Sequence, residues 1–157
     1  MTEATVKHAT IVLERRFSAP AARIFAAWTD PAIRKQWDVP EEGWETTEID
    51  QDFRVGGHER IRFGPKGDPI YFSDGRYLDI VPNVRIVSAG AMHIDDPRSS
   101  LTLCTIELIT DGAGARLILT DQSAYLDGLE SPGDREGGWG AALDNLQAYV
   151  GGSDAAA

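Results

Sequence analysis

The chain has 157 residues, of which 42% are hydrophobic, and a formal net charge of −10. This length fits one domain with its own core, and the net charge repels nucleic-acid phosphates and anionic lipids. We therefore expect neither nucleic acid nor a membrane as a partner. No segment approaches the ~20 apolar residues of a membrane span, and residues 1–5 lack the features of a signal peptide, which together predict a cytoplasmic protein.

The start of the domain predicts one strand and then two short helices. Residues 9–17 favour a strand because they contain the run Ile11-Val12-Leu13. Ser18 is a plausible helix cap and Pro20 suits a first helical turn. Pro31 is then expected to begin the second helix, since proline is tolerated at a first helical position.

Six further strand-like segments follow, separated by short turns rich in Gly, Pro, Asn and Asp. They cover residues 44–53, 58–63, 70–80, 84–94, 101–110 and 115–125. Short turns join antiparallel neighbours, whereas parallel strands need long crossover connections. The middle of the chain therefore predicts an antiparallel sheet.

The last segment predicts a long amphipathic helix. Ser131 is placed to cap it, Pro132 suits its first turn, and Asp134 follows three residues after the cap. The apolar residues of this helix share one face because they are spaced by four, three and four positions. They are Trp139, Leu143, Leu146 and Val150.

These elements predict an α+β domain over residues 9–150, in which a curved antiparallel sheet of six to seven strands is wrapped round the last helix. We expect residues 1–8 to form a flexible start and residues 151–157 a disordered tail. Cys104 is the single cysteine, so no intrachain disulfide can form. In its strand it is expected to be a small buried residue rather than a reactive thiol.

Several motifs resemble one known family when their order and spacing are taken together. They are Arg16-Phe17-Ser18-Ala19-Pro20, Phe25, Trp28-Thr29-Asp30-Pro31, Trp37, Asp52-Phe53-Arg54-Val55-Gly56-Gly57, the segment 75–82, Gly138-Trp139, Leu143 and Leu146. The chain, from about residue 11 to 150, resembles the activator-of-heat-shock-protein-90-ATPase-like family of the START-related, polyketide-cyclase-like (SRPBCC) superfamily. This resemblance implies the helix-grip fold, with a pocket between the sheet and the last helix.

The resemblance does not imply one chemistry, since relatives include lipid carriers, cyclases, hydroxylase partners and a co-chaperone domain. We expect first a protein that binds a hydrophobic or amphipathic small molecule in the pocket, without a cofactor. Aromatic and apolar side chains on the elements that should border the pocket are the expected ligand-binding residues, although core packing would explain most of them. They are Trp28, Trp37, Phe53, Ile61, Phe63, Phe72, Trp139, Leu143 and Leu146.

The second hypothesis is an enzyme of the cyclase, hydrolase or isomerase type. Its candidate general bases are Glu59, Asp121 and His93, and at least one of them would have to face the pocket with a perturbed pKa. The alternative for Glu59 is a place at the pocket mouth or a pairing with an arginine such as Arg60, Arg62 or Arg76, and for His93 it is a surface position at a strand end.

Metal binding and a chaperone partner are the remaining hypotheses. The three histidines, His8, His58 and His93, have no ligand-type spacing, so we expect no metal site. A chaperone partner ranks last, because the eukaryotic activators carry an extra N-terminal domain that this chain is expected to lack. A monomer and a homodimer both remain open.

Overall fold

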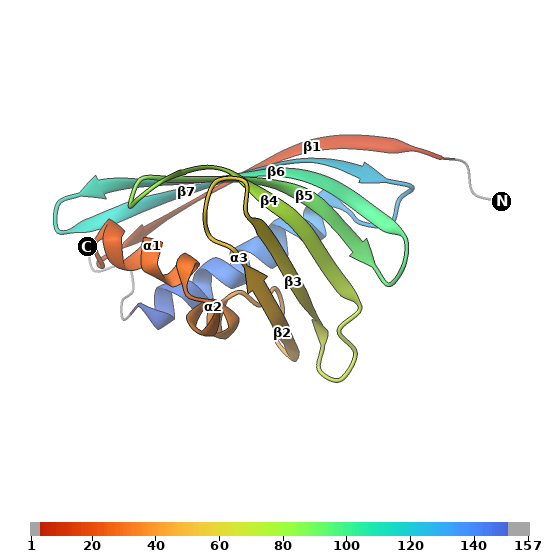
Figure 1. The fold of residues 1–157 in the computed structure, drawn as a ribbon, viewed down its shortest axis with the longest axis horizontal. Helices are drawn as coiled ribbons and strands as arrows, with labels where there is room; N and C mark the ends of the chain where they lie inside the picture. Colours follow the sequence, from red (N-terminus) through yellow and green to blue (C-terminus); the bar gives the residue numbers. More distant parts are fainter. Residues whose placement is uncertain (1–3, 151–157) are drawn as a thin grey trace.

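The computed structural model describes residues 4–150 and contains a seven-stranded antiparallel sheet with three helices on its concave side (Figure 1). The spatial order of the strands is β1-β7-β6-β5-β4-β3-β2. The strands are β1 (Val6–Phe17), β2 (Trp44–Gln51), β3 (His58–Pro65), β4 (Tyr71–Val81), β5 (Arg85–Ile94), β6 (Arg98–Asp111) and β7 (Gly114–Leu126). The helices are α1 (Ala21–Thr29), α2 (Pro31–Trp37) and α3 (Pro132–Tyr149). This arrangement confirms the predicted α+β helix-grip fold.

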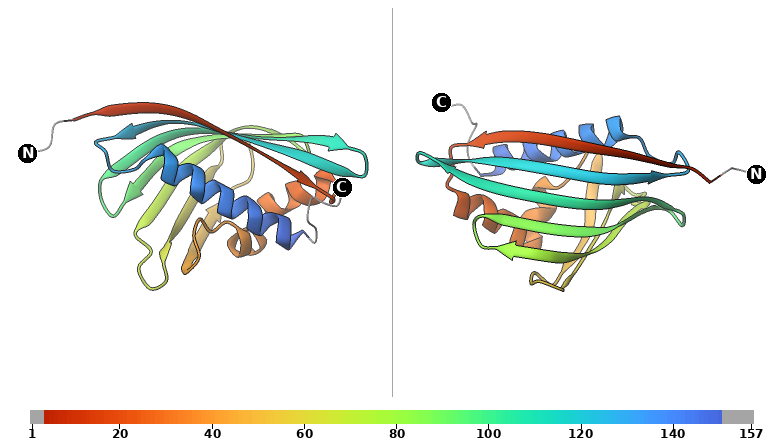
Figure 2. Two further views of the ribbon diagram at one scale, coloured as in Figure 1. Left: turned by 180° about the vertical axis from the view of Figure 1, so that it is seen from behind. Right: turned by 90° about the horizontal axis from the view of Figure 1, so that it is seen from above.

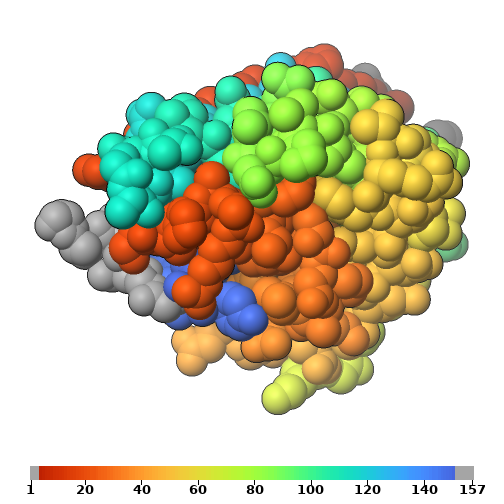
Figure 3. All heavy atoms as spheres, turned by 60° about the vertical axis from the view of Figure 1, so that its left-hand side comes forward, coloured from red at the N-terminus to blue at the C-terminus, as the bar shows by residue number. Residues whose placement is uncertain are grey.

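The sheet curves round α3, which runs across its concave face (Figure 2). The shorter helices α1 and α2 close one end of the molecule between the β6–β7 hairpin and the β2–β3 side of the sheet (Figure 3). None of the described helices is long and apolar enough to cross a bilayer.

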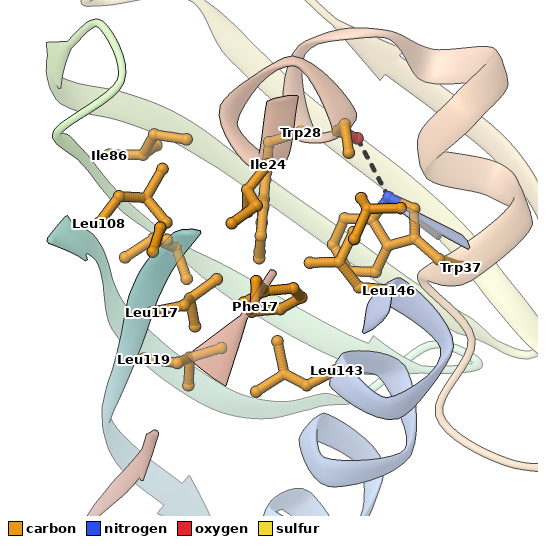
Figure 4. Close-up of a cluster of buried hydrophobic side chains, with 14 of the residues drawn as sticks. Phe17, Ile24, Trp28, Trp37, Ile86, Leu108, Leu117, Leu119, Leu143 and Leu146 are labelled. Atoms are coloured by element: carbon orange, nitrogen blue, oxygen red, sulfur yellow. Dashed lines mark hydrogen bonds between the residues drawn. The ribbon is translucent and has the colours of Figure 1, made fainter. Parts of the chain in front are cut away.

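The hydrophobic core lies at this closed end (Figure 4). Ile24 of α1, Leu117 and Leu119 of β7, and Leu143 and Leu146 of α3 are all 0% exposed. Side chains from two helices and the sheet therefore fill the space under the C-terminal half of α3, which fixes this half of the helix on the sheet.

The beginning of the fold differs from the prediction in two details. β1 starts at Val6, opposite Leu126, so His8 pairs with Ala124 inside a strand and does not belong to a flexible start. Ser18 is not the cap of α1. Pro20 occupies that position without a side-chain hydrogen bond, and its carbonyl accepts from the next turn. The predicted tail, residues 151–157, lies outside the described residues.

The start of α2 follows the prediction. Pro31 is its first residue, and the Asp30 carboxylate accepts a hydrogen bond from the Ala32 amide at 2.9 Å. Trp37, at the end of α2, donates its indole N–H to the Ala27 carbonyl of α1 at 3.1 Å and is completely buried (Figure 4). This contact locks the two short helices together.

The long helix α3 also begins as predicted, since the Ser131 hydroxyl accepts from the Asp134 amide at 3.1 Å. Leu143, Leu146 and Val150 are buried, whereas Trp139 is only half-buried. The predicted apolar face of α3 thus divides into a C-terminal part in the core and Trp139, which lies over a more open part of the sheet.

A pair of facing glycines brings β4 and β5 close together. Gly75 lies opposite Gly90, and a Cβ at Gly90 would be 2.6 Å from the Asp74 carbonyl oxygen. Any side chain there would collide with backbone, so only glycine allows this approach. Both residues belong to the inner wall that α3 faces.

Candidate functional site

A cavity of about 740 Å³ separates the concave face of the sheet from the N-terminal half of α3. Its floor comes from β3 to β7 and its roof from α3, and the loop after α2 borders it on one side. The apolar part of the wall combines three indoles with a phenyl ring and branched aliphatic groups. These residues are Trp28, Trp44, Ile61, Phe63, Ile86, Ile106 and Trp139.

Besides Asp134, Arg135 and Trp139, the part of α3 that lines the cavity consists of glycines and alanines. Gly133, Gly137 and Gly138 are lining residues, followed by Ala141 and Ala142. A Cβ at Gly133 or Gly137 would meet no atom within 4 Å. This part of the helix therefore leaves space above the sheet that larger side chains would fill.

One buried polar cluster lies where α2 meets the sheet. The Arg34 guanidinium donates to Glu59 at 2.7 Å and to Asp38 at 2.9 Å, and the Tyr77 hydroxyl donates to Glu59 at 2.9 Å. Burial opposes the charge of Arg34, but the two carboxylates outweigh it and raise the pKa of this guanidinium. Burial and the neighbouring Glu59 raise the pKa of the Tyr77 hydroxyl. A charged arginine thus ties α2 to β3 and β4.

A second buried cluster anchors the start of α3. Arg135 donates to Asp121 at 3.1 Å and to Glu130 at 2.7 Å. The Trp139 indole N–H donates to the same Asp121 carboxylate at 3.0 Å, and Asp121 is 0% exposed. Glu130 also accepts from Ser99 at 2.7 Å. These bonds hold the N-terminal half of α3 above β6 and β7 while the cavity stays open beside them.

Cys104 lines the cavity between the two clusters. Burial raises the pKa of its thiol strongly, and the charges of Asp121 and Glu59 raise it further. Cys104 therefore remains a neutral, unreactive thiol as predicted, although it is half-buried and not fully buried.

The structure brings only part of the predicted ligand-binding set to the cavity wall. Trp28, Ile61, Phe63 and Trp139 line the cavity, together with the candidate bases Glu59 and Asp121. The remaining predicted residues are not in this wall: Trp37, Phe53, Phe72, Leu143, Leu146 and the candidate base His93.

Four of these residues pack into the interior of the protein instead of lining the cavity. Trp37, Leu143 and Leu146 are completely buried in the core. Phe53 packs between Phe25 and Tyr77, with ring centroids 5.7 and 4.8 Å away.

Phe72 lies on the opposite face of the sheet from the predicted one, and His93 takes the surface position that was the alternative for it. They are cross-strand partners and stack on each other with ring centroids 6.3 Å apart, while the lining residues of β4 are Tyr71, Ser73 and Gly75. Side chains alternate between the two faces of a strand, so Phe72 and its partner His93 belong to the convex face.

Sequence reasoning missed Arg34 and Arg135, which pair with the candidate carboxylates Glu59 and Asp121. The arginines considered for Glu59 were Arg60, Arg62 and Arg76, and among the described residues none of them pairs with it. The spacing of Arg34 and Trp37 was a signal that Arg34 faces the interior, since residues three apart on a helix share a face.

Comparison with known proteins gives the family. The model of the Activator of Hsp90 ATPase homolog 1-like protein family matches residues 18–151. A protein of Rhizobium leguminosarum is 36% identical with a TM-score of 0.86, and the alignment covers 95% of this chain and 98% of that one. The Mll3558 protein of Rhizobium loti is 39% identical with a TM-score of 0.82, over 92% and 99% of the two chains.

The CV1439 protein of Chromobacterium violaceum is 31% identical with a TM-score of 0.78, over 90% of this chain and 96% of that one. No curated protein matches the chain. The family model and these structures agree over nearly the whole domain. The chain belongs to the Activator of Hsp90 ATPase homolog 1-like family.

Proposed function

We propose that this protein binds a hydrophobic or amphipathic small molecule in the cavity between its sheet and α3. The observation that carries this proposal is the cavity itself, because about 740 Å³ of space lies within the range of small-molecule sites. Its wall combines large apolar groups such as Trp28 and Ile61 with a few fixed polar groups. A pocket of this kind suits an apolar ligand that carries a polar end.

The glycine-rich part of α3 supports the same function. Glycine inside a helix costs roughly 0.5–1 kcal/mol relative to alanine. At Gly137 the space for a side chain is free, so packing does not require glycine there. A bound ligand that occupies this space would account for glycine at this position.

The two buried clusters favour binding over catalysis. Glu59 and Asp121 line the cavity, but each already accepts a hydrogen bond from an arginine. Both carboxylates are therefore engaged in holding the cavity wall in shape. An enzymatic role remains the second hypothesis, and an interaction with a chaperone, which the family name alone suggests, remains the third.

A fluorescence titration tests the binding function. N-phenylnaphthylamine is neutral and becomes brighter in apolar surroundings, so its emission should rise on binding and saturate with the protein concentration. A Gly137→Leu variant should weaken this binding about tenfold or more, since the new side chain would occupy the cavity.

Gly140→Leu is the matched control on the same helix. A Cβ at Gly140 faces the Arg15 side chain at 3.6 Å, and Gly140 is not a lining residue. This variant should bind the probe as the unmodified protein does. Absence of saturable binding, or equal loss in both variants, would contradict the proposed function.

A further inference from the structure

Three aromatic rings form one wall at the rim of the cavity. Trp44 begins β2, Phe63 lies on β3 and Tyr71 begins β4, and all three are lining residues. The rings of Phe63 and Tyr71 are stacked at 5.2 Å and 18°, and the Trp44 ring lies 5.1 Å from that of Tyr71. We call Trp44, Phe63 and Tyr71 the aromatic rim.

The charged groups that line the cavity are mostly acidic. Among the described lining residues there are seven carboxylates and two guanidinium groups. The guanidinium groups are those of Arg34 and Arg135, and each is bound by two carboxylates. The members of the acidic set are Asp38, Glu41, Glu42, Glu59, Asp121, Glu130 and Asp134.

Three of these carboxylates have no cationic partner in the part of the chain that the structure describes: no salt bridge there involves Glu41, Glu42 or Asp134. Glu41 and Glu42 precede Trp44 in the loop after α2, and Asp134 is in the first turn of α3. These exposed carboxylates therefore line the cavity from two different elements.

Two of these acids, Glu41 and Asp134, act on Tyr71 of the aromatic rim. The pKa of the Tyr71 hydroxyl is raised by burial first, and then by the negative charges of Glu130, Asp134 and Glu41. A positive charge placed beside Tyr71 would be attracted by the same field.

We propose that the bound molecule carries a cationic group, an amine or a quaternary ammonium, which rests on the aromatic rim while its apolar body fills the cavity. This inference deepens the proposed function and rests on it. A cation over the faces of Trp, Tyr and Phe rings gains cation–π energy, which grows when the site is partly desolvated. The three unpaired carboxylates add a favourable field at the same place.

An anionic end group has no comparable position. Arg34 and Arg135 are the cations of the described wall, and both are saturated by carboxylate pairs. An anion could reach either guanidinium only by displacing a buried carboxylate, which would leave that charge unpaired at a high cost. Lys66, on the β3–β4 hairpin, is exposed and does not line the cavity.

Three probes with the same apolar chain separate the effect of charge from that of apolar burial. Decyltrimethylammonium, decanol and decanoate are each titrated against the complex with N-phenylnaphthylamine, and displacement gives their affinities. The cationic probe should bind at least about tenfold more tightly than decanoate and about fivefold more tightly than decanol.

Variants assign this preference to the rim. The triple change Glu41→Gln, Glu42→Gln and Asp134→Asn should reduce the affinity for the cationic probe at least about fivefold and leave that for decanol unchanged. Glu136→Gln is the control, since Glu136 is an exposed carboxylate of α3 outside the cavity wall. This control should leave all three affinities unchanged.

The outcomes separate the two proposals. Tight binding of decanol with no preference for the cationic probe would overturn the cationic ligand but not the proposed function. The same conclusion would follow if the triple variant still preferred the cationic probe. Tighter binding of decanoate than of the cation would overturn it as well. Failure of all three probes to displace bound N-phenylnaphthylamine would overturn the cationic ligand alone, whereas absence of saturable N-phenylnaphthylamine binding would contradict both proposals.

Discussion

The Trp139 indole N–H donates to the Asp121 carboxylate at 3.0 Å, although the two residues come from α3 and β7. The same oxygen accepts from Arg135, one turn earlier on α3. A single buried carboxylate therefore holds two points of the helix that roofs the cavity. The cavity wall and the stability of the fold depend on the same group.

Removal of the indole donor alone should weaken this attachment. A Trp139→Phe variant keeps an aromatic ring but loses the hydrogen bond, so the free energy of unfolding should fall by about 1–3 kcal/mol. Urea denaturation measures this change. Trp44→Phe is the comparison, because no hydrogen bond of the Trp44 indole occurs within residues 4–150. If both variants lose the same free energy of unfolding, the hydrogen bond from Trp139 to Asp121 makes no specific contribution to stability.

Loss of the Asp121 charge should have a larger effect. Asp121→Asn leaves Arg135, which is 11% exposed, with only Glu130 as an anionic partner. Breaking a buried pair typically costs about 3–5 kcal/mol, and the remaining partner should reduce this to about 2–4 kcal/mol. The exposed pair of Arg85 and Asp79 offers a control, since Asp79→Asn should change stability by about 0–1 kcal/mol. Equal urea midpoints for the two variants would contradict this account.

The half-buried Cys104 thiol should make stability depend on pH in the alkaline range. The pKa of Cys104 is raised in the folded protein above its ordinary value of 9.0, mainly by burial. Below that value both states carry the proton, so the contribution of this thiol is fully present. Above it the unfolded chain releases the proton and the folded protein retains it, so stability should fall by up to about 1.4 kcal/mol per pH unit.

A Cys104→Ala variant isolates this effect. Its free energy of unfolding should decline less steeply between about pH 9 and pH 10 than that of the unmodified protein, as measured by urea denaturation. Iodoacetamide should also react with the folded protein more slowly than with the unfolded chain at about pH 8. Parallel stability profiles for the two proteins would show that Cys104 does not titrate on unfolding.

The sequence predicts the fold well because its signals are local. The helix α3 has a cap at Ser131 and one apolar face, and short turns separate the strands, so element types and the antiparallel arrangement follow from spacing. The period-two spacing of Glu59, Ile61 and Phe63 places them on one face of β3, and all three line the cavity.

The site is predicted less completely because it depends on contacts between distant segments. The choice of Phe72 instead of Tyr71 as a cavity residue depends on the register of β4, which pairs Tyr71 with Phe63. A shift by one residue exchanges the two faces of a strand, and the hairpin loop does not reveal that register. Likewise, Arg34 and Glu59 are 25 residues apart, and only the packing of α2 on the sheet brings them together.

The glycines of α3 and of the sheet should respond in opposite ways to alanine. At Gly137 a Cβ meets nothing within 4 Å, so Gly137→Ala should raise the free energy of unfolding by about 0.5–1 kcal/mol through helix propensity. At Gly90 a Cβ would be 2.6 Å from the Asp74 carbonyl oxygen, so Gly90→Ala should destabilise the sheet. Thermal unfolding of the two variants measures both effects. A loss of stability in Gly137→Ala would mean that α3 lies closer to the sheet than the cavity requires, and the binding proposal would lose its structural basis.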